Sequence, residues 1–150
     1  MARKDVFDNP KHYENPKLYS RGLRLSNFSE LFFISGYSAA SGPPDGSGPP
    51  VVEYPNDAIS QMQWIVESLD AYIANVPYSD GTGHYSVNDV IYFDLVLSST
   101  IDGDTREQAL YYLESWFASA DTKPSTGILK MVEALASPEI LVEMELILAH

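Results

Sequence analysis

The segment "VNDVIYFDLVLSS", residues 87–99, is dense in β-branched and aromatic side chains and carries a regular alternation. The side chains that fall on one face at a period of two are Ile91, Phe93, Leu95 and Leu97. Tyr92 and Asp94 fall on the opposite face, which is therefore half polar. This alternation predicts a well-buried strand with one apolar face, around which the rest of the chain is organised.

Helical patterns stand before and after this strand. In residues 56–75, apolar side chains recur at steps of three and four, and Asn56 or Asp57 is the expected N-cap. Residues 102–119 carry a second helical stripe, formed by Ala109, Leu110, Leu113 and Phe117. Apolar stripes of this kind must be covered, and one face of a sheet can cover both helices.

Four further segments are predicted to be strands: "LRLS" (23–26), "ELFFISG" (30–36), "TGILKMVEALAS" (126–137) and "ILVEMELILAH" (140–150). The first two are separated by a tight turn and are expected to pair with each other, and for the last a helix is an alternative. The predicted order is β-β-α-β-α-β-β. It describes an α+β fold with a small, mostly antiparallel sheet and two helices packed on one face.

The second face of the predicted sheet has no helix to cover it. Its expected residues include Tyr92, Asp94, Glu143 and Glu145, mixed with aliphatic side chains. A half-polar sheet face is either in contact with water or buried in an oligomer. We favour burial in an oligomer.

The length of 150 residues corresponds to one domain. Residues 1–18 contain two Asn-Pro steps and are predicted to form an N-terminal arm, followed by a single domain over residues 19–150. Residues 37–55 are rich in Pro and Gly. We interpret them as a loop that borders a binding site, with a flexible tether as the alternative.

Composition excludes several classes of function. The chain has 9 Lys and Arg against 21 Asp and Glu, a net charge of −12 that disfavours nucleic acids and anionic membranes as partners. The absence of cysteine excludes disulfides and a cysteine nucleophile and suits a cytoplasmic location. Neither a secretory signal nor a membrane span is predicted. His12, His84 and His150 are too scattered to indicate a metal site.

The segments "LYSRGLRL", "LFFISG", "DAISQMQWIVESLDAYI", "VNDVIYFDLVL" and "LVEMELI" occur in an order that resembles the reactive intermediate deaminase family (Rid, YjgF-type). The resemblance covers roughly residues 17–150 and depends on order and spacing, because each segment alone is common. It implies a homotrimer whose active sites lie in clefts between subunits. It also implies the hydrolysis of enamines or imines to ketones and ammonia, without a cofactor.

The resemblance implies roles for individual residues. Tyr19 matches the family tyrosine and Glu143 the family glutamate, and both are expected to be catalytic. Ser35 and Gly36 match the Ser-Gly that ends a strand, and they are expected to bind substrate. Tyr37 follows directly and is expected to face the cleft.

The family's carboxylate-binding arginine has no match in this chain. Alignment on Ser125 and Thr126, which are themselves candidate substrate-binding residues, places Pro124 at the arginine position, and alignment on "VEAL" places Gly127 there. Lys123 is a candidate replacement, and Lys130 is another. The family asparagine on the second helix is also replaced, with Leu110 nearby.

These departures argue against the usual 2-iminoacid deaminase activity. The sequence predicts an enzyme that acts on a small reactive enamine, imine or enol by hydrolytic deamination or a related water or proton transfer. The expected partners are two further copies of the chain and a small organic substrate. The alternative is a non-catalytic trimer that binds a small ligand and serves regulation.

Overall fold

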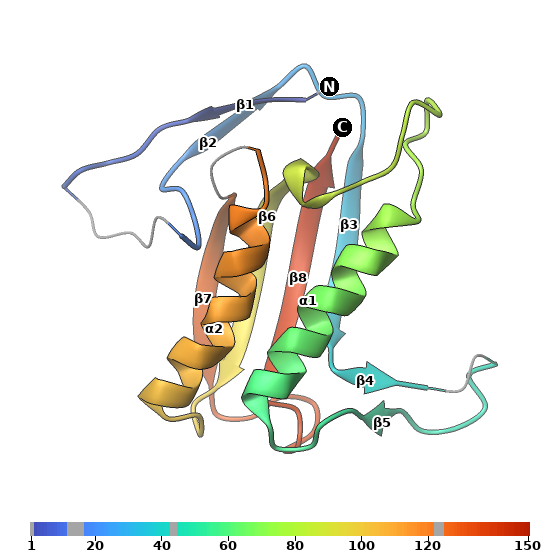
Figure 1. The fold of residues 1–150 in the computed structure, drawn as a ribbon, viewed down its shortest axis with the longest axis vertical. Helices are drawn as coiled ribbons and strands as arrows, with labels where there is room; N and C mark the ends of the chain where they lie inside the picture. Colours follow the sequence, from blue (N-terminus) through green and yellow to red (C-terminus); the bar gives the residue numbers. More distant parts are fainter. Residues whose placement is uncertain (1, 12–16, 43–44, 122–124) are drawn as a thin grey trace.

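The computed structural model describes residues 2–11, 17–42, 45–121 and 125–150. A four-stranded sheet has the order β3 (Leu31–Ser38), β8 (Val142–Ala149), β6 (Val90–Ser98) and β7 (Thr126–Val132). β8 pairs antiparallel with β3 and β6, whereas β6 and β7 run parallel. The helices α1 (Ala58–Ala74) and α2 (Gly103–Ala118) cover one face (Figure 1). The predicted α+β fold with two helices on one face is confirmed.

The core lies between the helices and the sheet. β8 contributes every second side chain, and β6 does the same over most of its length. The alternating buried residues of β6 and β8 are Val90, Phe93, Leu95, Leu97, Val142, Met144, Leu146 and Leu148. The prediction for Ile91 is wrong, because the register shifts between Val90 and Tyr92 and Val90 takes the buried position.

Side chains at the start of α1 cap this helix and fix where β8 begins. The Asp57 carboxylate accepts a hydrogen bond from the Ser60 N–H (3.0 Å) and caps α1. One turn later, the buried Gln61 donates from Nε2 to the Glu139 carbonyl (2.7 Å). The Oε1 of the same side chain accepts from the Leu141 N–H (2.8 Å). Because Leu141 directly precedes β8, this amide fixes the entry of the chain into the central strand.

The N-terminal part of the chain adds a small second sheet. β1 (Arg3–Val6) pairs antiparallel with β2 (Leu23–Ser26), so the predicted pairing of residues 23–26 with 30–36 is wrong. The Nζ of Lys4 donates to the carbonyls of Val90 (2.9 Å) and Asn88. Burial lowers the pKa of Lys4 to about 8, although Asp89 partly opposes the shift. These contacts tie β1 to the start of β6.

The Pro/Gly-rich segment also contains local structure. β4 (Ala40–Ser41) and β5 (Val51–Val52) pair as two short strands that project from the body of the molecule (Figure 1). The Ser41 hydroxyl donates to the Glu53 carboxylate (2.6 Å) at the base of this arm. A 3-10 turn, η1 (Val87–Asp89), leads into β6. Within the described residues, no helix is long and apolar enough to cross a membrane.

Gly127 on β7 generates a test of the packing. A Cβ atom at this position would lie 2.4 Å from the ring of Phe93, which is fully buried. The ring of Phe93 is rigid and packed in the core, so it cannot move aside as the end of a flexible side chain could. Gly127→Ala is therefore expected to lower the free energy of unfolding by about 1–3 kcal/mol. Urea denaturation measures the effect. Gly103→Ala is the control, because a Cβ there meets nothing within 4 Å, and equal stability of the two variants would contradict this packing.

Candidate functional site

The face of the sheet that the helices leave uncovered, here called the open face, carries three rows of paired side chains. One row is Phe33, Ile147, Tyr92 and Thr126. The next is Glu145, Asp94 and Ile128, and the last is Ser38, Glu143, Val96 and Lys130. The open face is therefore half polar, as the alternation predicts. Two of its apolar side chains are strongly exposed, Phe33 by 64% and Ile128 by 41%.

Charge on the open face is partly paired. The Lys130 Nζ lies 2.6 Å from Oδ2 of Asp94, and this hydrogen bond raises the pKa of the lysine. The Oδ1 of Asp94 is buried without a partner among the described residues. Lys130 therefore already has a partner on this face in the single chain, and its role as a replacement for the arginine stays a prediction.

Glu143 lies beside a β-bulge of β3. Between Ile34 and Tyr37 the register with β8 shifts, so that Ser35 and Gly36 together oppose a single residue of β8. A Cβ at Gly36 would lie 1.9 Å from Oε1 of Glu143. The carboxylate therefore rests directly against the glycine backbone, in a small cavity of about 120 Å³ that also reaches Lys130. Gly36 and Glu143, both predicted for the site, are therefore in contact, and Ser35 precedes Gly36 in the same bulge.

Tyr37 is not part of this group. Because the bulge adds one residue, Tyr37 pairs with Met144 and faces the helices. Its hydroxyl makes a hydrogen bond with the Ser68 hydroxyl of α1, and its ring lies 6.1 Å from that of Trp64. The expectation that Tyr37 faces the cleft with Glu143 is wrong for the single chain, since the sheet separates the two side chains.

A second, larger cavity of about 680 Å³ lies along the free edge of β7, and we call it the edge pocket. The described residues that line it are Leu18, Tyr19, Arg21, Tyr92, Leu110, Gly127, Ile128 and Leu129. The segment that brings Tyr19 there is held by the Ser20 N–H, which donates to the Ser125 carbonyl (3.0 Å). Tyr19 packs its ring 6.5 Å from that of Phe93.

The edge pocket contains the positions at which the resemblance expects other residues. Leu110 lies near the place of the family asparagine, and Gly127 is one of the two residues that alignment puts at the arginine position. Sequence reasoning missed Arg21, which also lines this pocket. Its signal was present in "LYSRG", where a cation follows Tyr19 by two residues.

Two other candidates lie next to this pocket and use their hydroxyls differently. Ser125 is buried, and its Oγ has no partner among the described residues. Thr126 donates its hydroxyl to the Ile91 carbonyl (2.9 Å). Their roles in substrate binding stay predictions.

Lys123 lies outside the described residues. His84 is exposed, and its strand-like bridge to Pro77 closes the loop before β6.

Tyr19 and Glu143 line different cavities in the single chain. The edge pocket lies at the edge strand β7, whereas the cavity at Glu143 lies over β6, β7 and β8 on the open face. No group of His, Asp and Glu side chains in the described ranges could hold a metal ion. The side chains that line the two cavities can make hydrogen bonds, pair charges and transfer protons.

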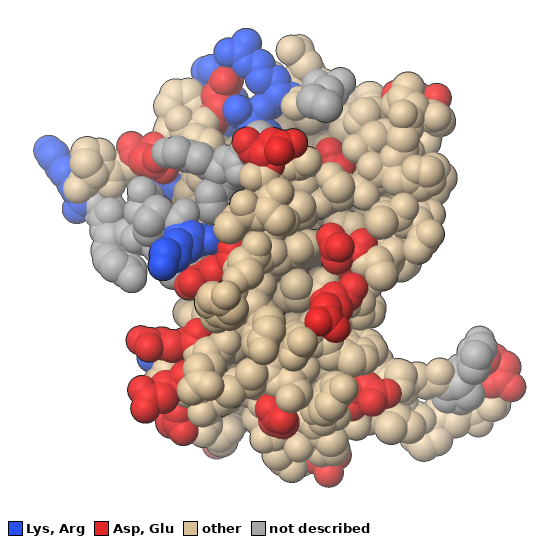
Figure 2. All heavy atoms as spheres, viewed as in Figure 1, with Lys and Arg blue, Asp and Glu red and all other residues tan. Residues whose placement is uncertain are grey.

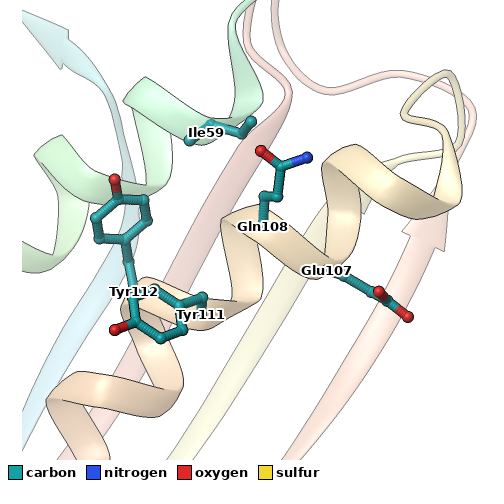
Figure 3. Close-up of a pocket in the computed structure, with 5 residues that line it drawn as sticks. All are labelled: Ile59, Glu107, Gln108, Tyr111 and Tyr112. Carbon is teal, nitrogen blue, oxygen red and sulfur yellow. The ribbon is translucent and has the colours of Figure 1, made fainter.

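A third cavity lies between the helices and away from the sheet. It measures about 380 Å³ and is lined by Ile59, Glu107, Gln108, Tyr111 and Tyr112. Figure 3 shows Tyr112 pointing toward α1 while Glu107 points away from the groove. None of the residues predicted for the site lines it.

Comparison with known proteins identifies the fold. Neither models of protein families nor curated proteins match the sequence. Among solved structures, a Yersinia pestis protein of unknown function from the conserved Rid family, YyfB, is similar over 98% of both chains, with 18% identity and a TM-score of 0.71. Escherichia coli TdcF with bound serine is similar over 91% of this chain and 96% of its own (18% identity, TM-score 0.58). A YjgF-family protein from Neisseria meningitidis is similar over 99% of this chain and 94% of its own (17% identity, TM-score 0.55). The predicted Rid-type fold is confirmed.

The contact between Gly36 and Glu143 can be tested without unfolding the protein. The added methyl of Gly36→Ala meets the end of a flexible side chain, so we expect the carboxylate to move and the free energy of unfolding to change by less than about 1 kcal/mol. A carboxyl-carbon NMR resonance of Glu143 that shifts in Gly36→Ala but not in Gly42→Ala is the expected result. An unmoved resonance would contradict the contact.

Proposed function

We propose that this chain is a member of the Rid family that assembles as a homotrimer and acts on a small reactive imine, enamine or enol. The observation that carries the proposal is the division of the candidate site, with Tyr19 in the edge pocket and Glu143 on the open face. A site divided in this way becomes a single cleft when the open face of one copy meets the edge of the next. The whole-length similarity to Rid-type structures supports this arrangement.

The exposed apolar side chains support assembly through the open face. Phe33 and Ile128 stand at opposite sides of this face, and Leu31 adds a third exposed side chain (42%) on β3. Covering such residues removes apolar area from water and favours association. The ion pair between Lys130 and Asp94 lowers the free-energy cost of burying these two charges between copies of the chain.

The proposed reaction is the hydrolysis of a protonated imine. As the oxygen of a water molecule bonds to the imine carbon, the carboxylate of Glu143 accepts one of the water protons and the C=N electrons return to nitrogen. Glu143 then gives this proton to the nitrogen of the carbinolamine. The C–N bond breaks as C=O forms, and the hydroxyl proton leaves with ammonia as ammonium. Tyr19 donates a hydrogen bond that orients the substrate.

Similar structures support a small organic ligand. The Escherichia coli TdcF structure contains serine, a molecule of seven non-hydrogen atoms by its formula. The edge pocket, at about 680 Å³, has room for a larger molecule, and its aromatic and aliphatic lining favours an aromatic or otherwise apolar body. We therefore propose that the substrate is not a simple 2-imino acid.

Replacement of the proposed acid and base tests the reaction. Glu143→Gln removes the proton acceptor and keeps the shape of the side chain, so ammonia release above the uncatalysed rate should fall by about 10²-fold or more. The substrates are a panel of aromatic imines without a carboxylate, generated in situ from arylalkylamines by an amine oxidase, and ammonia is the readout. Glu133→Gln is the matched control, because Glu133 is exposed beyond the end of β7.

The same assay separates the two candidate functions. Absence of ammonia release by the wild-type protein across the imine panel would contradict the deaminase proposal. Retained ligand binding in that case would favour the non-catalytic trimer, for which the replaced positions Leu110 and Gly127 are the supporting observation.

A further inference from the structure

The two helices carry half of the net charge of the chain. With their N-cap residues Asp57 and Asp102, α1 and α2 contain seven carboxylates and one basic side chain, Arg106, which gives −6 of the total of −12. Figure 2 views this helix layer and shows red side chains spread over it, whereas blue side chains gather over the N-terminal part of the chain. The helix layer therefore attracts cationic groups and repels nucleic acids and anionic membranes.

Part of this negative charge has no cation beside it. Four exposed carboxylates of the helices take part in no ion pair among the described residues: Glu67, Asp70, Asp104 and Glu107. Two of them accept hydrogen bonds from neutral donors, Glu67 from Gln63 (3.1 Å) and Asp70 from the indole of Trp116 (2.8 Å). Neutral donors leave the negative charge in place, so an incoming Lys or Arg side chain would find it available.

The cavity of about 380 Å³ between α1 and α2, here called the helix groove, opens on this layer. Its apolar wall consists of Ile59, Tyr111 and Tyr112, and no basic side chain is among the described residues that line it. Tyr111 is 64% exposed, and its ring lies 5.9 Å from that of Tyr112. Exposed aromatic side chains beside a groove are typical of anchor points at protein interfaces. Glu107 points away from the groove in Figure 3, toward a segment that would cross α2.

The charge of the helix layer selects among possible occupants of the groove. A second copy bound through the same layer would bring −6 against −6, which is repulsive. In the assembly proposed above, copies meet through the open face on the other side of the sheet, so the helix layer stays accessible. The 16 residues of α2 extend over about 24 Å, and about seven residues of extended chain span the same length. A short basic segment can therefore reach both the groove and the carboxylates around it.

We propose that the helix groove docks a short basic segment of another protein. An aliphatic or aromatic side chain of the segment packs against Ile59, Tyr111 and Tyr112, and its Lys and Arg side chains lie beside the exposed carboxylates of the helices. Tyr111 also offers the face of its ring to a cation. This interaction surface is separate from the edge pocket and from Glu143, so it adds a protein partner to the proposed reaction and does not depend on it.

Fluorescence anisotropy with three labelled, end-capped peptides tests the inference on the full-length protein. RKLFRK carries both cations and an apolar anchor, RKGGRK lacks the anchor, and QQLFQQ lacks the charge. RKLFRK should bind at least 10-fold more tightly than either of the others, because the groove and the carboxylates act together. Its affinity should also weaken as salt increases.

Variants of the groove locate the binding. Tyr111→Ala should weaken RKLFRK at least 5-fold and leave RKGGRK unchanged, whereas Tyr111→Phe, which keeps the ring, should bind as the wild type does. Tyr72→Ala is the matched control, because Tyr72 is an exposed tyrosine of α1 that does not line the groove. Glu107→Gln should weaken RKLFRK more than Glu133→Gln does, although both remove one charge from an exposed position.

Four outcomes would overturn the inference. RKLFRK could fail to bind the wild type, or it could bind no more tightly than RKGGRK, which would leave only general attraction to an acidic protein. Equal losses in Glu107→Gln and Glu133→Gln would place the peptide elsewhere. A lower sedimentation mass of Tyr111→Ala than of Tyr111→Phe would make the groove an interface between copies. Thermal midpoints equal to that of the wild type guard against a change in folding, and Tyr111→Phe keeps the comparison valid if Tyr111→Ala does not fold.

Discussion

The register of β8 is the constraint on which the rest of the structure depends. This strand lies between β3 and β6, and its alternate residues from Val142 to Leu148 fill the core. A shift of one residue would place Glu143 among the helices and Met144 in the open. The bonds from Gln61 to Glu139 and Leu141 fix the strand at its start. The position of the candidate acid and base is thus a consequence of core packing.

Most of the fold could be predicted from periodicity. The helices and the central strand have patterns long enough to be unambiguous, and Asp57 is the cap that its residue type indicates. The pairing of β2 was not predictable in the same way, because its partner β1 is short and lies in a polar arm. Local pattern says that a segment is extended, but it does not identify which segment lies beside it.

In the candidate site, too, the local sequence pattern does not identify which residues come into contact. The alternation locates Glu143 on the open face, but its contact with Gly36 depends on the bulge of β3, which the sequence pattern does not show. Tyr37 faces the other side because a bulge adds one residue, and nothing in the alternation of "LFFISGY" reveals where that residue is. Arg21 was missed for another reason. Its significance depends on the edge strand β7, which is distant in sequence and lacks a side chain at Gly127.

We propose that the active site is completed only in the assembly, since Tyr19 and Glu143 line different cavities of each copy. The central claim is that the open face is buried between copies. Sedimentation velocity at micromolar concentration measures this most directly. The account predicts a single species of about three times the chain mass of 16.7 kDa. A species of one chain mass at that concentration would contradict it, because the open face and the edge pocket would then have nothing to enclose.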